Sequence, residues 1–248
     1  MFLVKIGSSV ITNKSKYRVF REKKTSEIID NLGKMGEPFV LVHGGGSFGH
    51  LKAKEYSLPG PLTKESVRGF TIVHGDMVDL SQKVVKIMIR TGLNGISIPP
   101  AFTMTGGSLR TEIFQDHFDR GFIPVTFGDT YIRNSSVEII SGDDLVLQLA
   151  VRLKPDRVIF LTDVDGIYDR NPKKYADARL LRNLAVEAKF EMHGTDVTGG
   201  MENKVRVMKK ISELGATVYL LNGNVSSRLH EIGTDRFTGT VIKSITLP

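Results

Sequence analysis

Apolar residues along this chain fall into short continuous runs that alternate with longer stretches of helical spacing. The short runs are typical of buried β-strands and lie at residues 2–9, 39–42, 96–100, 122–127, 137–140, 156–162 and 216–223. Apolar residues recur every three or four positions, as in amphipathic helices, at residues 64–90, 145–153 and 201–215. Two shorter helices are expected, one capped by Thr25 or Ser26 and one around residues 116–120.

This alternation predicts an α/β fold, a mainly parallel sheet between two helical layers in a three-layer αβα sandwich. In such sheets, ligands bind where the strands end and the loops lead into helices. Glycines gather at these positions, namely Gly7, Gly44, Gly45, Gly46, Gly128, Gly142 and Gly166. We therefore expect the binding site at the carboxyl edge of the sheet.

Composition narrows the class of protein. The chain has 248 residues, enough for one large α/β domain or two small ones, with no internal repeat or flexible linker. The sequence contains no run of about 18 apolar residues, so no membrane span is predicted. The first residues read as a strand rather than a signal peptide, so we expect a cytoplasmic protein. The absence of cysteine excludes disulfides and thiolate metal sites.

The net charge of +7 suits an anionic partner, either a small molecule such as ATP and a phosphate ester or a nucleic acid. The densest basic segment is "KSKYRVFREKK", residues 14–24. It can be a solvated face, a loop that faces phosphate, or a nucleic-acid arm.

The glycine-rich segment "VHGGGSFGH", residues 42–50, contains the spacing of two known phosphate motifs but completes neither. A dinucleotide fingerprint needs a second strand that ends in an acidic residue, and residues 51–66 contain two prolines and no strand. A P-loop needs Lys and Ser or Thr after the last glycine, where this chain has His50 and Leu51. Both motifs share backbone N–H groups that bind an anion near a helix N-terminus, and we expect that chemistry here.

The second half of the chain carries further candidate motifs. "SGDD" places Asp143 and Asp144 at a strand–helix junction, and "TGGMENK" places two glycines before a helix that bears Lys204. "LTDVDGIYDRNP", residues 161–172, resembles a calcium loop only in its aspartate spacing, because the later Gly and Glu are missing. Each of these motifs also suits an ordinary helix N-cap.

Taken in order, "VKIGSS", "VHGGG", "SGDD", "LTDVDGIYDRNP" and "TGGMENK" resemble the amino acid kinase family over essentially the whole chain. Within that family, "HGGGSFGH" resembles the isopentenyl phosphate kinases. The resemblance implies that residues 1–152 bind the phosphate acceptor and residues 153–248 bind ATP with Mg²⁺. It also implies a homodimer, with small molecules rather than nucleic acid or membrane as partners.

The resemblance further implies roles for single residues. The catalytic set is Lys5, Lys14, His50, Asp143 and Lys204. The ATP-binding set is Lys5, Gly7, Ser8, Ser9, Gly46, Asp163, Gly166, Tyr168, Lys174, Gly199, Gly200 and Lys204. The substrate-binding set includes Gly44, Gly45 and His50, which would contact the acceptor phosphate, together with Gly128 and Gly142. The resemblance implies no direct protein ligand for the metal, although Asp144 is a candidate for Mg²⁺.

An apolar acceptor tail needs a buried pocket next to the phosphate. The helix that follows the glycine loop would supply Phe70, Val73 and Met77, and Ile140 would close the far end. A kinase of another small phosphorus or carboxylic acid, of the antibiotic, acetylglutamate or uridylate type, is the alternative on the same fold. A nucleotide-responsive sensor and a basic nucleic-acid binder are the alternatives that are not enzymes.

Overall fold

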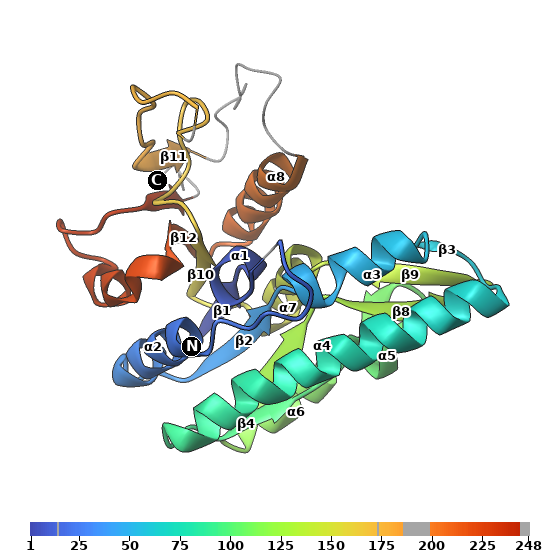
Figure 1. Ribbon diagram of the computed structural model, residues 1–248. Coiled ribbons are helices and arrows are strands. Elements are labelled where there is room, and N and C mark those ends of the chain that lie inside the picture. The colour runs from blue at the N-terminus through green and yellow to red at the C-terminus, as the bar shows by residue number, and fades with distance from the viewer. Residues whose placement is uncertain (14, 173, 186–198, 244–248) are drawn as a thin grey trace.

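The computed structural model describes residues 1–13, 15–172, 174–185 and 199–243 (Figure 1). Its main sheet has eight strands in the order β11-β13-β12-β10-β1-β2-β7-β4. Their bounds are β1 Phe2–Ile6, β2 Phe39–His43, β4 Gly95–Ser97, β7 Ile123–Phe127, β10 Arg157–Thr162, β11 Asn183–Ala185, β12 Thr217–Asn222 and β13 Thr240–Lys243. All neighbours run parallel except β12 and β13. The predicted mainly parallel sheet is confirmed.

Two short sheets accompany the main one. Strands β3 (Gly60–Pro61), β8 (Asp129–Arg133) and β9 (Ser136–Ile140) form an antiparallel sheet, and β5 (Met104–Thr105) pairs with β6 (Ser108–Leu109). The strand expected at residues 137–140 therefore belongs to a hairpin beside the main sheet.

Helices cover both faces of the main sheet, as Figure 1 shows. Their bounds are α1 Ser8–Ile11, α2 Glu22–Lys34, α3 His50–Glu55, α4 Lys64–Arg90, α5 Pro100–Thr103, α6 Glu112–Asp119, α7 Gly142–Leu153 and α8 Gly199–Glu213. Two 3₁₀ segments are η1 Gly46–Phe48 and η2 Gly223–Glu231. None of the described helices is long and apolar enough to cross a membrane.

The alternation of side chains along β1 divides the core into two layers. Phe2, Val4 and Ile6 pack with α2 and α4 on one face. Leu3 packs with α6, α7 and α8 on the other face. Lys5 points to this second face and is 7% exposed, so the period of the strand places a lysine inside the protein. The three-layer αβα sandwich is confirmed.

The start of α2 differs from the expectation. Neither Thr25 nor Ser26 caps this helix, because it begins three residues earlier, at Glu22. Thr25 is buried inside the helix, and its hydroxyl donates to the carbonyl of Arg21 at 3.0 Å. The threonine thus bonds the preceding turn, a use that competes with capping.

Candidate active site

The carboxyl ends of the central strands bring the predicted phosphate-binding segments together. β1 leads into Gly7 and α1, β2 into the glycine loop, and β10 into Asp163. The Gly7 N–H donates to the Leu161 carbonyl at 2.7 Å, and the Gly44 N–H donates to the Ile6 carbonyl at 3.0 Å. Both N–H groups are therefore used in bonds to neighbouring strands. A ligand role for either glycine would depend on a close approach of the ligand to its backbone rather than on a hydrogen bond from its N–H.

A cluster of two lysines and one aspartate lies at this edge. Lys5 Nζ is 2.9 Å from Asp143 Oδ1, and Lys204 Nζ is 2.9 Å from Asp143 Oδ2. The three residues come from β1, α7 and α8, and their side chains are 9–13% exposed. The fold therefore brings together three of the five predicted catalytic residues. Lys14 lies outside the described residues.

The charges of this cluster are unequal, with two ammonium groups for one carboxylate. Burial would raise the pKa of Asp143, but the charges of Lys5 and Lys204 outweigh it and lower that pKa. Burial and the charge of Lys5 lower the pKa of Lys204 against the attraction of Asp143. An anion beside the two lysines would offset both the burial of Lys204 and its repulsion by Lys5. The cluster is therefore suited to polyphosphate.

The glycine loop packs tightly against its neighbours. A Cβ at Gly45 would lie 2.7 Å from Met77 Sδ, and one at Gly46, whose φ is +51°, would lie 2.1 Å from Thr12 Oγ1. The left-handed backbone of Gly46 therefore favours glycine whatever binds to the loop, whereas a side chain at Gly45 would have to displace the flexible end of Met77. The predicted contacts of Gly44, Gly45 and Gly46 with substrate remain predictions.

Two histidines flank this loop in different environments. His50 is exposed as the first residue of α3, which leaves it accessible to a ligand. His43 is fully buried, stacks on Phe127, and has a pKa lowered to about 4 by burial. His43 thus packs inside the protein in its neutral form, and the proposed phosphate contact of His50 remains a prediction.

The predicted ATP side is ordered by hydrogen bonds around two aspartates. Ser9 Oγ donates to Asp163 Oδ1 at 3.0 Å. Asp165 accepts from Arg228 at 2.5 Å, from Asn222 at 3.0 Å and from the hydroxyl of Tyr168 at 3.5 Å. These bonds lower the pKa of Asp165, with Asn222 as the largest contribution.

Four further predicted ATP-binding residues lie in the second half of the chain. Gly166 is buried, and a Cβ there would lie 2.5 Å from Thr240 Oγ1. Lys174 is exposed, and Gly199 and Gly200 begin α8. Nucleotide contacts of all four positions remain predictions.

The predicted acceptor pocket divides between the two core layers. Val73 and Met77 are buried in the layer that contains α4, and Phe70 packs against it half-buried. Ile140 lies in the other layer, so the structure does not group it with these three side chains. Gly128 and Gly142 face each other, since a Cβ at Gly128 would lie 3.3 Å from the Gly142 N.

A histidine–aspartate pair that links α4 to the start of β8 was not predicted from the sequence. His74 Nδ1 is 2.9 Å from Asp129 Oδ2, and the His74 ring stacks on Phe70 and meets Phe102 edge-on. Asp129 also accepts from the N–H groups of Thr130 and Ala101. The only sequence signal was Asp129 directly after Gly128 at a strand end.

Carboxylates do not form a metal cluster among the described residues. Asp144 exchanges hydrogen bonds with Ser141, the N-cap of α7, at 2.6 and 3.1 Å. Asp143 holds two lysines. The predicted role of Asp144 as a Mg²⁺ ligand remains a prediction.

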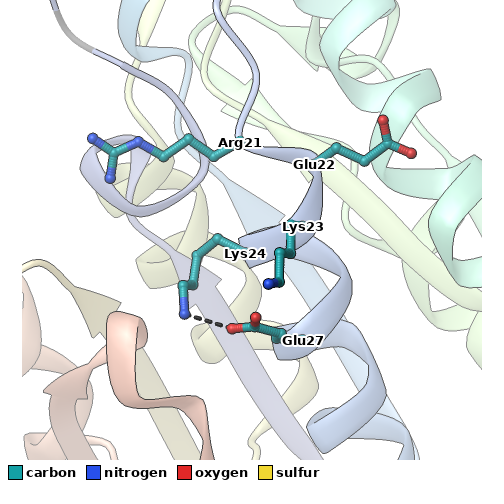
Figure 2. Close-up of a pocket in the computed structure, with 5 residues that line it drawn as sticks. All are labelled: Arg21, Glu22, Lys23, Lys24 and Glu27. Atoms are coloured by element: carbon teal, nitrogen blue, oxygen red, sulfur yellow. Dashed lines mark hydrogen bonds and ion pairs between the residues drawn. The ribbon is translucent and has the colours of Figure 1, made fainter.

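A shallow groove lies at the start of α2, lined by Arg21, Glu22, Lys23, Lys24 and Glu27 (Figure 2). Lys24 pairs with Glu27 at 2.5 Å and also donates to the Asn224 carbonyl of η2 at 3.1 Å. Arg21 donates to the Ser9 carbonyl at 3.3 Å. Part of the basic segment is therefore used in contacts within the protein.

The chain belongs to the amino acid kinase family, whose model matches residues 1–222. An isopentenyl phosphate kinase of Thermoplasma acidophilum is 44% identical over 98% of this chain and 100% of its own length. One of Methanothermobacter thermautotrophicus is 32% identical over 96% of this chain and 99% of its own length. A solved product complex of the T. acidophilum enzyme superposes with a TM-score of 0.89, covers 98% of this chain and 100% of that one, and is 41% identical.

Proposed function

We propose that the protein is an ATP-dependent isopentenyl phosphate kinase. An oxygen of the isopentenyl phosphate monoester attacks the γ-phosphorus of ATP, and the bond from that phosphorus to the β,γ-bridging oxygen breaks. The products are isopentenyl diphosphate and ADP. The observation that supports this most is the Lys5–Asp143–Lys204 cluster at the carboxyl edge of the sheet, in a chain similar over nearly its whole length to isopentenyl phosphate kinases.

The reaction brings two polyanions together, so it depends on positioning and on neutralising charge. Asp143 orients the two ammonium groups, and the lysines stabilise negative charge on the transferred phosphoryl group. Mg²⁺ bound to ATP would neutralise oxygens of the nucleotide. A phosphate monoester is largely ionised at neutral pH, and the attack therefore needs no strong general base.

The test is release of ADP over a panel of acceptors with ATP and Mg²⁺. Isopentenyl phosphate and dimethylallyl phosphate should be turned over, whereas N-acetylglutamate, glutamate, uridylate and a phosphonic-acid antibiotic should not. Preference for another member of the panel would assign the chain to a different kinase of the family. Absence of turnover with every acceptor would favour the sensor, and nucleic-acid affinity that falls steeply with salt would favour the binder.

The finer expectations on assembly, location and the two halves of the chain remain part of the proposal. The main sheet continues from β1 into β10, so residues 1–152 and 153–248 share one sheet. The family resemblance supports a homodimer, which a molar mass from light scattering would test. The cytoplasmic location rests on sequence alone.

A further inference from the structure

Residues 15–20 of the basic segment, which precede α2, are attached to the acceptor-side helix α4. The hydroxyl of Tyr17 donates to Asp76 Oδ2. Arg18 pairs with Asp76 Oδ1 at 3.3 Å and with Asp79 Oδ2 at 2.5 Å. Asp76 is 6% exposed, and both of its carboxylate oxygens bind this segment. A carboxylate that is this buried needs such partners.

The same segment covers the glycine loop. The Arg18 N–H donates to the Ser47 carbonyl at 3.5 Å, and its guanidinium lies over the ring of Phe48, 5.8 Å from the centroid. At the base of the segment, Thr12 fills the space next to Gly46. Burial and the bond to Asp76 raise the pKa of Tyr17 to about 12, so this hydroxyl stays protonated and donates over the whole working pH range.

Helix α4 therefore supports the glycine loop in two ways, one direct and one through the segment that covers it. Met77 touches it directly, at Gly45, while the preceding residue, Asp76, holds the segment that covers it. We propose that Asp76 is a positioning residue for phosphoryl transfer. Through Tyr17 and Arg18 it fixes the cover of the glycine loop, and so keeps the loop's backbone in place for the acceptor phosphate. This role rests on the proposed function.

The test compares Asp76→Asn, Tyr17→Phe and Asp79→Asn with Asp30→Asn, which breaks only an exposed pair with Lys34 on α2. Amide hydrogen exchange of residues 15–20 is measured without substrate, and steady-state kinetics are measured on the folded variants. Exchange should increase most for Asp76→Asn, and kcat should fall by about 10- to 100-fold, as expected for misplaced groups. Tyr17→Phe and Asp79→Asn should do less, and Asp30→Asn nothing.

Wild-type exchange at residues 15–20 in Asp76→Asn and Tyr17→Phe would overturn the proposal. So would increased exchange with kcat and both KM values unchanged, since a merely structural tether lowers the Tm without altering turnover by the folded enzyme. If the wild type does not turn over isopentenyl phosphate, the proposed function is wrong, independently of the role of Asp76. The kinetics then use whichever acceptor the panel identifies, while the exchange measurement stands by itself.

Discussion

Asp143 at the start of α7 and Asp129 at the start of β8 are both largely shielded from solvent, with side chains 13% and 0% exposed, yet their surroundings move their pKa values in opposite directions. Asp143 faces two lysines, whose charges outweigh the effect of burial and lower its pKa. Asp129 faces one histidine, and burial raises its pKa despite the bond to His74. The first cluster has an excess of positive charge and is suited to an anion. The second is balanced one to one and is suited to holding elements together.

The excess charge at Asp143 should matter most for catalysis. Lys5→Ala and Lys204→Ala should each lower kcat by about 10³-fold, because a preorganised donor to the transition state is lost. KM for ATP should change less. Steady-state kinetics against Lys34→Ala, an exposed lysine paired within α2, provide the measurement and its control. If only KM changes, the lysines bind substrate without stabilising the transition state.

His50 tests whether the acceptor phosphate needs a donor in addition to the lysine cluster. His50→Ala should lower kcat by about 10²–10³-fold with isopentenyl phosphate, and Gln or Asn should recover part of the loss if a neutral N–H donor suffices. Kinetics on folded variants decide this. A His50→Ala enzyme close to wild type in kcat and KM would remove the role and weaken the assignment to this kinase group.

The balanced pair at Asp129 should act on binding rather than on turnover. Asp129 ties His74 of α4 to the Ala101 N–H of α5, and α4 carries Phe70 and Val73. Asp129→Asn should raise KM for isopentenyl phosphate by roughly 10-fold with little change in kcat, since ground-state and transition-state binding weaken together. A loss in kcat equal to that of the lysine variants would erase the contrast between the two aspartates.

The same pair should make stability depend on pH. The hydrogen bond to Asp129 raises the folded-state pKa of His74 above its unfolded value of about 6.5. Its stabilisation is therefore complete below that value and is lost as the pH rises through the folded pKa. The Tm difference between wild type and Asp129→Asn should therefore shrink as the pH rises above about 6.5. A difference that stays constant would mean that His74 does not titrate with the fold.

The alternation of strands and helices predicted the sheet and both helical layers, because period and turn residues are local signals. Lys5 could be placed at the site through the family motif, and its burial follows from the two-residue period of β1. The His74–Asp129 pair joins residues 55 positions apart, and Tyr17 reaches Asp76 over 59 positions. No periodicity or short motif encodes such pairs, since they arise only when α4 packs across the strand ends.

The start of α2 shows a second limit. Thr25 suited a cap by residue type, yet the segment that holds Tyr17 and Arg18 ends at Arg21, and the helix can begin directly after it. Tertiary anchoring upstream of a helix thus decided its first residue. The local capping preference is worth only about 1 kcal/mol, too little to oppose such contacts.

Phe70 tests the pocket beside the His74–Asp129 pair. Phe70 is half-buried on α4 and stacks on His74, with ring centroids 5.8 Å apart. Phe70→Ala should open space for longer prenyl phosphates and shift the ratio of kcat/KM between ten- and five-carbon acceptors by roughly 10-fold, the lower end of what one methylene of pocket contact is worth. The matched control is Phe122→Ala, at the opposite, amino-terminal end of β7. If Phe70→Ala folds and keeps the wild-type ratio, Phe70 serves the His74–Asp129 pair and does not line the acceptor pocket.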